Sequence, residues 1–252
     1  ESDESIPKTS IGAQELILAL LKERAETGRI YIMNIDHCNS HSSFIDKVEM
    51  SNLCQEITLP TKPIQHIDDD SGEIALCILS AINIGKIRDV SDLKSLCDLS
   101  VRSLDELIDF QGYPVEAAQI ATKARRSLGI GYIGLAHYLA KQGVKYEDPK
   151  AWELVHDLTE AFQYHLIEST VNLAKEKGAC EYSDRTKYAQ GILPIDTYKK
   201  DVDELVPNNL KYDWETLRAL VKEHGVRNST LSAQMPSESS SVVSNATNGI
   251  EP

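Results

Sequence analysis

The sequence predicts an α/β fold built around a mostly parallel sheet. Short apolar runs, typical of buried strands, alternate with longer segments in which apolar residues recur at helical spacing, and turn residues separate most of them. The chain has 252 residues, 41% of them apolar, which can bury a large core in one large domain or two small ones. We find no internal repeat and no convincing linker, so we expect a single region over residues 1–252.

The first third of the chain predicts one helix and several extended segments. The helix has apolar residues at helical spacing, with Thr9 and Ser10 as possible N-terminal caps and Gly28 as its stop. A polar stretch and a turn rich in proline and aspartate separate the extended segments. The predicted elements are a helix over 11–28, a short strand over 30–33, an extended segment over 52–59 and a buried strand over 72–80.

The rest of the chain predicts helices that alternate with two further strands. Ser91 and Asp213 are suitable N-terminal caps, a proline begins the longest helix, and Gly178 and Gly225 are typical C-terminal stops. Strands separated by helices in this way favour parallel pairing. The predicted helices cover residues 91–110, 115–126, 135–141, 149–177 and 213–224, and the predicted strands cover residues 128–133 and 227–233.

Charge and cysteine content narrow the classes of function. The net charge is −13, so the basic surface that nucleic acids and anionic membranes require is missing. The cysteines are odd in number and dispersed, and the sequence has neither a signal-peptide pattern nor an apolar run long enough to span a bilayer. These features favour a reducing, cytoplasmic location. The five cysteines are Cys38, Cys54, Cys77, Cys97 and Cys180.

The most informative motif is the row Asn52, Cys54 and Glu56. Side chains alternate along an extended segment, so these three residues would share one face. A thiol flanked by an amide and a carboxylate could present a hydrogen-bond donor, a one-electron or nucleophilic sulfur and a general base to one bound molecule. The same string could also arise on a half-buried strand in which the cysteine is only a small apolar side chain.

A serine-rich turn near the C-terminus could bind an anion. If Pro236 starts a helix, the free backbone amides of Ser237, Glu238, Ser239 and Ser240 and the positive end of the helix dipole point at one spot. Hydroxyl groups lie beside these amides, and the combination suits a diphosphate. The alternative interpretation is a flexible serine-rich linker.

Two further patterns do not predict sites. Residues 129–134 match the glycine spacing of a dinucleotide-binding loop, but the glycines lie inside the apolar run and no acidic residue follows at the usual distance of about 20 residues. We expect a strand whose glycines allow close helix packing. His37, Cys38 and His41 could be combined with Cys54 into a zinc site, but their spacing matches no strong ligand pattern, and we expect no metal.

Several unusual strings occur together in this chain. They are residues 51–56, residues 72–80 with Cys77, residues 191–198, residues 227–231 and the C-terminal segment 236–252. In content, order and separation they resemble the large, catalytic subunit of the aerobic, class I ribonucleotide reductases. The resemblance covers the full length of the chain.

The resemblance implies a role for each residue of the motif. Cys54 matches the cysteine at the tip of the finger loop that becomes a thiyl radical and removes the hydrogen from the 3′ carbon of the ribose. Glu56 matches the general base on the 3′ hydroxyl, and Asn52 matches the amide that orients the substrate hydroxyls. Cys77 matches one of two cysteines that reduce the 2′ carbon and end as a disulfide, and in the family its partner lies upstream of residue 1.

The resemblance also implies a phosphate site and an architecture. In the family the serine turn binds the substrate phosphates, which implies Ser237, Ser239 and Ser240 as ligands, with Glu238 turned outward. The family's catalytic domain is a ten-stranded α/β barrel of two five-stranded halves with the finger loop through its centre. This chain would supply the loop and most of the second half. It would lack the N-terminal half-barrel, the allosteric domain and the C-terminal tail, through either a split gene or a truncation.

The activity implied is the reduction of ribonucleoside diphosphates to deoxyribonucleoside diphosphates by thiyl-radical chemistry, for which this chain would need the missing segments. No cofactor is expected to bind the chain directly. A metal-containing small (beta) subunit would generate the radical, and thioredoxin or glutaredoxin would supply electrons. A complementary large-subunit fragment would be a further partner if the gene is split, whereas direct DNA or membrane binding is not expected.

Two alternative functions stay open from the sequence. The chain could be a non-catalytic piece that completes a partner chain by docking an exposed barrel edge. It could also be a cysteine hydrolase, with Cys54 as nucleophile and His37, His66 or His137 as base. No motif places any of these histidines beside the sulfur.

Overall fold

The computed structural model describes residues 5–252, and the chain divides into two compact units, the second of which begins at Ile35. The described part of the first unit contains α1 (Ala13–Thr27), which ends as predicted at Gly28 with φ +66°. Residues 30–33, predicted as a strand, form no regular structure. Their backbone groups find no partner strand among the described residues, and Tyr31 and Ile32 are exposed.

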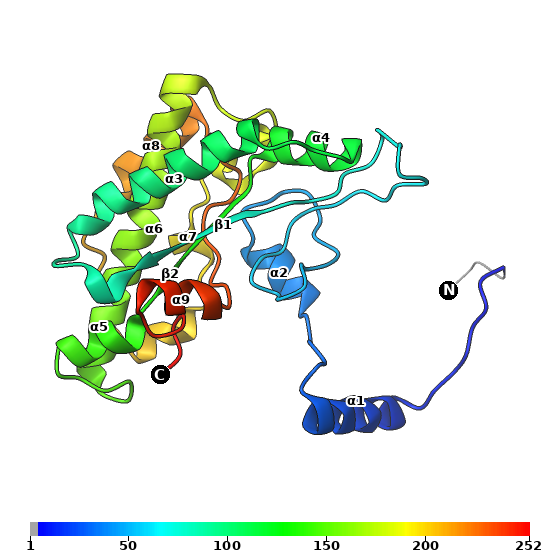
Figure 1. Ribbon diagram of the computed structural model, residues 1–252, viewed down its shortest axis with the longest axis horizontal. Helices are drawn as coiled ribbons and strands as arrows, with labels where there is room; N and C mark the ends of the chain where they lie inside the picture. The colour runs from blue at the N-terminus through cyan, green and yellow to red at the C-terminus, as the bar shows by residue number, and fades with distance from the viewer. Residues whose placement is uncertain (1–4) are drawn as a thin grey trace. The chain divides into compact units, whose positions relative to one another are not determined.

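Two parallel strands form the centre of the second unit, and Figure 1 shows them side by side. β1 (Ile78–Asn83) pairs with β2 (Leu128–Ile133) along its whole length. Residues 230–233 follow the other edge of β2 through a parallel bridge between Ile130 and Ser232 and backbone hydrogen bonds of 2.8–3.2 Å. β2 is therefore the central element, and every residue in it is buried, as the sequence predicts.

The two neighbours of β2 depart from the predicted strands. β1 begins six residues later than the predicted segment 72–80, because the backbone before it is bound elsewhere: the Ile74 amide donates to Ala117 O at 3.1 Å. β1 is also an edge strand with partly exposed residues, so the prediction of a buried strand is wrong. The predicted strand over 227–233 is only partly formed, as the single bridge of Ser232.

Helices pack around the strands and begin and end close to the predicted residues. The longest helix has Pro149 in its first turn and stops at Gly178. Asp213 caps another, and its carboxylate accepts a hydrogen bond of 3.0 Å from the Thr216 amide. These helices are α3 (Asp92–Phe110), α4 (Glu116–Arg125), α5 (Leu135–Lys141), α6 (Pro149–Lys177) and α8 (Trp214–His224).

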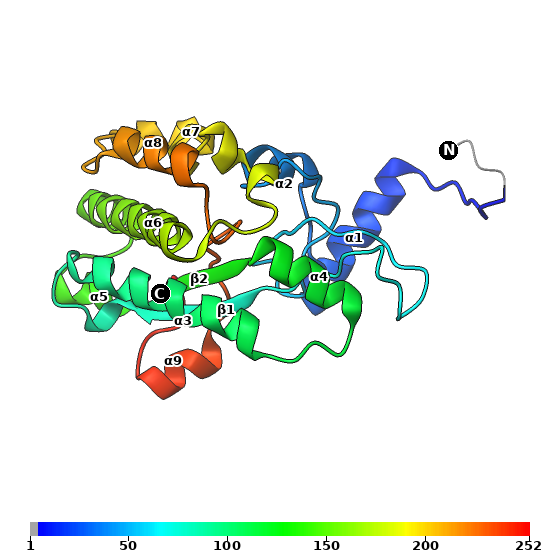
Figure 2. The same cartoon turned by 90° about the horizontal axis from the view of Figure 1, so that it is seen from above.

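Three short helices complete the unit, together with turns of 3₁₀ helix. α2 was not predicted, because its residues form part of a polar stretch, although Asp36 in its first turn and His41 in its last suit the helix dipole. Figure 2 shows α6 and α9 on opposite sides of the two strands. The short elements are α2 (Ile35–His41), α7 (Pro194–Thr197), α9 (Glu238–Ser244), η1 (Ile84–Lys86), η2 (Ser183–Arg185), η3 (Lys187–Gln190) and η4 (Lys200–Glu204).

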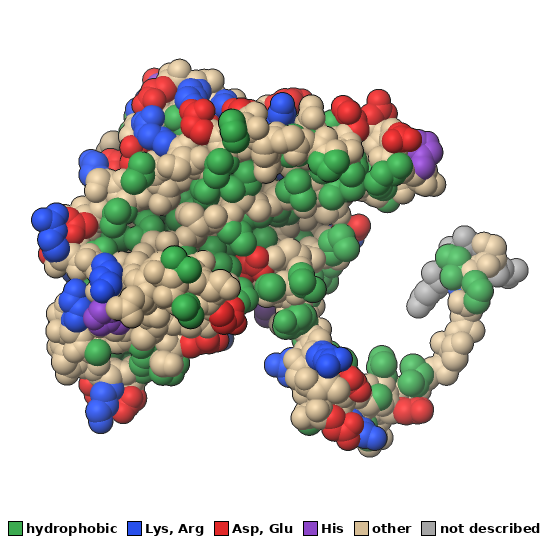
Figure 3. Space-filling model, viewed as in Figure 1, with side chains coloured by type: hydrophobic (Ala, Val, Ile, Leu, Met, Phe, Trp, Pro, Cys, Tyr) green, Lys and Arg blue, Asp and Glu red, His purple; other side chains and the backbone are tan. Residues whose placement is uncertain are grey.

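The core lies between the strands and the packed helices α3 and α6. Leu158 and Leu166 of α6 and Cys97 of α3 are fully buried there, so Cys97 is the structural thiol expected from its apolar neighbours. Apolar side chains also reach the surface and gather across the middle of the face in Figure 3. Among the exposed residues are Leu79 of β1 and Val242 of α9.

Candidate active site

The loop that carries Asn52, Cys54 and Glu56 is a tight turn and not the extended segment that the sequence predicted. Gln55 adopts φ +58°, a left-handed conformation outside the range of strand residues. Long backbone hydrogen bonds close the turn, from the Asn52 amide to Ile57 O at 3.4 Å and from the Gln55 amide to Asn52 O at 3.3 Å. The prediction that the three side chains share one strand face is therefore wrong, because side chains do not alternate through a turn.

The three side chains of this turn have different surroundings. Cys54 is exposed, as its expected place at a loop apex requires. The Oδ1 atom of Asn52 accepts a hydrogen bond of 3.3 Å from the Ile57 amide, which holds the turn closed and leaves the Nδ2 donors of Asn52 unused within the described chain. Glu56 is half-buried, and its Oε2 atom is buried with no hydrogen-bond partner among the described residues.

Glu56 lines a polar pocket of about 260 Å³. Ser42 lines the same pocket, and its hydroxyl is likewise buried without a partner in the part of the chain that the structure describes. Thr58, Gln163 and Lys187 add further polar side chains to the walls. Buried polar groups normally have a hydrogen-bond partner, so two unpaired oxygens on one small pocket are typical of a place for water or a polar ligand.

Cys77 lies directly before β1, half-buried against β2. A Cβ atom added to Gly129 would lie 2.8 Å from its sulfur, so the absence of a side chain there makes room for the thiol. Burial first, and the Glu56 carboxylate second, raise the pKa of the Cys77 thiol to about 12. Cys77 is thus a neutral thiol at pH 7, and the fold brings it into the electrostatic range of Glu56 although the loop separates the two in sequence.

The serine turn begins α9 at Glu238, two residues later than predicted, with Ser237 as the N-cap. Ser237 is buried, and its polar groups are already bonded inside the chain. Its amide donates to Asn248 Oδ1 at 3.0 Å, and its hydroxyl donates to Met235 O at 3.0 Å. Ser237 therefore supports the turn from within.

The next three residues of the turn are open to solvent. Glu238, Ser239 and Ser240 are all exposed. Helical hydrogen bonding starts with the Ser241 amide, which donates to Ser237 O at 2.8 Å, so the amides before it are the free donors of a helix start. The exposed carboxylate of Glu238 agrees with the expected outward direction of that side chain.

The other patterns of the sequence do not build a second site. Among residues 5–252 no group of three or more histidine, cysteine, aspartate or glutamate side chains is arranged to hold a metal ion. His41 contacts Thr197 O and His137 packs against Gly85, and no described histidine bonds to Cys54, as a cysteine hydrolase would need. None of the described helices is both long and apolar enough to cross a membrane.

Gly129 and Gly131 make room for extended chain rather than for a helix, which corrects one expectation, whereas Gly134 approaches Gly85 of η1. An added Cβ on Gly129 would meet Leu79, Cys77 and Ala233, and one on Gly131 would meet the backbone oxygen of Ala233. The close approach is therefore made on one side by the side chains of Cys77 and Leu79 and on the other by the segment after residue 230, which follows the edge of β2.

Comparison with known proteins identifies the family of the chain. The family model described as "Ribonucleotide reductase, barrel domain" matches residues 1–252. The chain belongs to the ribonucleotide reductase barrel family. It is 60% identical over its whole length to the ribonucleoside-diphosphate reductase subunit alpha of Haemophilus influenzae, 56% to the reductase 1 subunit alpha of Escherichia coli and 45% to the subunit alpha of Enterobacteria phage T4. It covers 34%, 34% and 33% of those proteins, so it spans about a third of their length.

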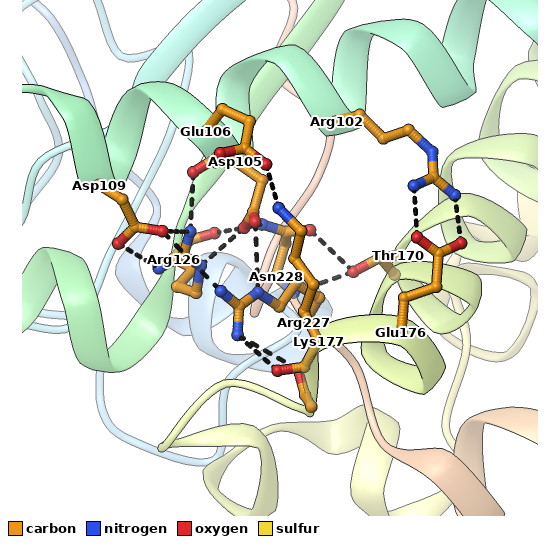
Figure 4. A network of polar contacts seen from close by, with 11 residues as sticks. Arg102, Asp105, Glu106, Asp109, Arg126, Thr170, Glu176, Lys177, Arg227 and Asn228 are labelled. Atoms are coloured by element: carbon orange, nitrogen blue, oxygen red, sulfur yellow. Dashed lines mark hydrogen bonds and ion pairs between the residues drawn. The ribbon is translucent and has the colours of Figure 1, made fainter.

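Two buried ion-pair clusters of this reductase barrel segment were not predicted from the sequence. The first is shown in Figure 4 and centres on Asp105 of α3, whose side chain is 0% exposed. Its carboxylate accepts hydrogen bonds from Arg126 Nε at 2.6 Å, Asn228 Nδ2 at 3.0 Å and Arg227 Nε at 3.2 Å. Arg126 also donates to Asp109 at 2.8 and 3.0 Å, so two acids balance two cations.

The second cluster forms around the preceding residue, Arg125, whose side chain is 3% exposed. It pairs with Glu73 and Asp46, and Arg185 pairs with the same two carboxylates. From the sequence, Arg125 and Arg126 were interpreted only as the last residues of the predicted helix 115–126. Two adjacent arginines between a helix and a buried strand are a signal of buried pairing, since an unpaired guanidinium there would carry a large desolvation cost.

Proposed function

We propose that this chain supplies the radical-bearing loop and one of two reducing thiols for the reduction of ribonucleoside diphosphates to deoxyribonucleoside diphosphates. The observation that supports this most directly is the polar pocket beside the loop: the buried, unpartnered Oε2 atom of Glu56 lines it, two residues from the exposed thiol of Cys54. The Glu56 carboxylate also contributes to the raised pKa of the Cys77 thiol, which comes from a separate segment. The relatives named above are called ribonucleoside-diphosphate reductases, which supports the same reaction.

Each residue has a distinct role in the proposed reaction. The thiyl radical of Cys54 takes the hydrogen atom from the 3′ carbon, a nearly balanced step because the two bonds are close in strength. Glu56 accepts the proton of the 3′ hydroxyl, and the unused Nδ2 donors of Asn52 orient the substrate hydroxyls. Cys77 and a second cysteine outside this chain supply two protons and two electrons. The 2′ hydroxyl leaves as water, hydrogen takes its place on the 2′ carbon, and the two sulfurs join as a disulfide. Cys54 then returns the hydrogen atom to the 3′ carbon, which restores the thiyl radical, and Glu56 returns the proton to the 3′ oxygen.

The substrate phosphates are proposed to lie at the start of α9. The amides and hydroxyls of Ser239 and Ser240 are exposed and suit phosphate oxygens. Ser237 contributes by fixing the turn, since its own amide and hydroxyl are bonded inside the chain. The exposed carboxylate of Glu238 can point into solvent, away from a bound anion.

The partners follow from the reaction. A metal-containing small (beta) subunit would generate the radical, and thioredoxin or glutaredoxin would reduce the disulfide after each turnover, in the cytoplasm. The exposed edge of β1 and the apolar side chains on the face in Figure 3 suit docking of the other half of a barrel. The rest of the large subunit, whether on the same polypeptide or on a complementary fragment, would cover this edge, and the chain alone would be inactive.

The test is an assay of ribonucleoside diphosphate reduction in a complete α subunit in which this sequence occupies the barrel segment, mixed with its β subunit and a thioredoxin system. Cys54→Ala and Glu56→Gln should each abolish product formation, because they remove the radical carrier and the general base. Cys38→Ala is the matched control, a half-buried thiol outside the proposed site, and should retain activity. Full activity in the Cys54→Ala variant would refute the assignment.

The phosphate site is tested separately by binding. A Ser239→Ala, Ser240→Ala double variant should raise the dissociation constant of the diphosphate substrate while radical formation in the β subunit stays unchanged. Ser244→Ala at the other end of α9 is the control and should bind normally. Equal binding by the double variant and the parent would show that the serine turn does not hold phosphate.

A further inference from the structure

The thiol loop, defined here as residues 46–73, leaves the body of the protein and returns to it at one guanidinium group. Arg125 Nη1 donates to Asp46 Oδ2 at 2.9 Å, where the loop begins. Arg125 Nη2 and Nε donate to Glu73 Oε2 at 2.8 and 3.1 Å, where the loop ends. Asp46 and Glu73 thus bracket the turn that carries Cys54 and Glu56.

A second arginine binds the same two carboxylates. Arg185 Nη2 lies 2.8 Å from Asp46 Oδ2, and Arg185 Nη1 lies 3.8 Å from Glu73 Oε1. Two cations therefore neutralise two anions in a site where the side chains of Arg125 and Glu73 are each only 3% exposed. Removing one charge from such a site leaves the others unbalanced, which is far more costly than at the surface.

Aromatic rings lie within cation–π distance of the two guanidinium groups. The Arg125 guanidinium carbon lies 5.0 Å from the ring centre of Tyr182 and 5.8 Å from that of Phe44, and the Arg185 carbon lies 4.1 Å from the ring of Tyr182. A lysine cannot reproduce this arrangement, because its ammonium group is a point charge without the flat fork that both stacks and donates in two directions.

Val48, Ile57 and Leu59 of the thiol loop are buried, whereas residues 52–55 at its tip are exposed or half-buried. The hydrogen bonds of the backbone amides around Cys54 measure 3.3–3.4 Å, at the long end of the normal range. The stems, in contrast, are well bonded: Lys62 and Glu73 exchange backbone hydrogen bonds of 3.0 and 3.1 Å, and the Ile45 amide donates to Arg185 O at 3.0 Å. The place of the turn therefore depends on where the stems are anchored.

We propose that Arg125, assisted by Arg185, is the positioning residue of the thiol loop: it holds both stems together and so sets where Cys54 and Glu56 lie. Arg125 is also the last residue of α4, three residues before β2, and β2 carries Gly129, against which the sulfur of Cys77 packs. The same residue thus ties the loop thiol to the strand that seats the second thiol. The catalytic consequence rests on the proposed function, whereas the anchoring of the loop does not.

The clamp is tested in the complete α subunit described above, with two matched pairs of variants. Arg125→Lys is compared with Arg126→Lys, the neighbouring buried arginine whose acids Asp105 and Asp109 lie outside the loop. Asp46→Asn, at a partly exposed member of the clamp, is compared with Asp109→Asn, and this milder pair decides the question if the arginine variants do not fold.

Two measurements are made on each variant. Arg125→Lys should lower turnover at least about tenfold while the substrate KM changes less than about twofold, because a loop displaced by an ångström costs the chemical step and not binding. It should also speed hydrogen exchange of the amides of residues 50–58 at least about tenfold. Asp46→Asn should change both in the same direction, and the controls Arg126→Lys and Asp109→Asn should leave both within about twofold.

Loop exchange that is unchanged in Arg125→Lys and Asp46→Asn would overturn the proposal, as would controls that accelerate loop exchange equally. If the parent subunit reduces no ribonucleotide, the proposed function fails, and the exchange comparison alone still decides whether Arg125 anchors the loop.

Discussion

The two glycines of β2 provide a graded test of the packing around Cys77. Replacing Gly129 by Ala adds a methyl group 2.5 Å from Leu79 Cδ2 and 2.8 Å from Cys77 Sγ. These two atoms are ends of side chains, and Leu79 is 42% exposed, so they can move aside. The third neighbour, Ala233 Cβ, lies 3.1 Å away and needs to give by only a few tenths of an ångström. We expect a loss in the free energy of unfolding of about 1 kcal/mol, at the low end of the range for overpacking.

Replacing Gly131 by Ala should cost more, because the new methyl group meets backbone. It would clash with the Ala233 oxygen and lie 3.0 Å from Met235 Sδ. The Ala233 residue is held to β2 by a hydrogen bond of 3.2 Å from its amide to Ile130 O, so relief of the clash breaks this contact. The expected loss is about 3 kcal/mol, at the upper end of the overpacking range.

Urea unfolding with linear extrapolation measures these differences in the free energy of unfolding. Gly112→Ala is the control, because a Cβ atom added to Gly112 has no atom within 4 Å and the φ of Gly112 is not positive. Gly112→Ala should be neutral or slightly stabilising, by less than about 1 kcal/mol. The rate at which Cys77 is alkylated should differ from that of the parent in the Gly129→Ala variant and equal it in the Gly131→Ala variant. A Gly129→Ala loss equal to or larger than that of Gly131→Ala would refute the reasoning.

Three other predictions concern charge, protonation and backbone conformation. Asp105→Asn should lower the free energy of unfolding by about 3–5 kcal/mol, because it removes the charge that Arg126 and Arg227 share, and a loss under about 1 kcal/mol would contradict the buried pairing. Stability should fall between pH 9 and 12, because burial raises the pKa of Cys77, Cys97 and Cys180 from 9.0 to about 12 and the unfolded chain therefore loses these protons first. A Cys97→Ala, Cys180→Ala variant should show a smaller fall over that range, and an equal fall would exclude the thiols as its cause. Gln55→Val should lower the free energy of unfolding by about 1–2 kcal/mol relative to Gln55→Gly, since residue 55 has φ +58°, and equal unfolding curves for the two variants would argue against the left-handed turn.

The regular elements were predictable wherever the sequence marks both ends. Asp213 and Gly225 bracket α8, and Pro149 and Gly178 bracket α6, because caps and stops act through backbone bonds within a few residues. The strands were less predictable. β1 starts late because Ile74 bonds to Ala117, a residue of another element, and no local pattern reports such a contact.

In the candidate site, too, the features that depend on neighbouring residues were predictable, and those that depend on residues far apart in the sequence were not. The strings around Cys54, Cys77 and the serine turn identify the family without any geometry, and the comparisons confirm that family. The predicted extended conformation around Cys54 was wrong, because the left-handed conformation of Gln55 is set by closure of the loop and not by strand propensity. The ion pairs of Arg125 with Asp46 and Glu73 join residues 79 and 52 positions apart, which a single sequence cannot match.

The left-handed conformation of Arg126, with φ +49° and ψ +47°, turns two neighbouring side chains toward separate sets of acids. A deletion or insertion of one residue at this point would therefore place each guanidinium beside the wrong acids and disturb the thiol loop and the contacts with α3 at once. Anyone who recombines segments from different reductases should place the crossovers well away from residues 124–128 and keep Asp46, Glu73 and Arg125 from the same parent.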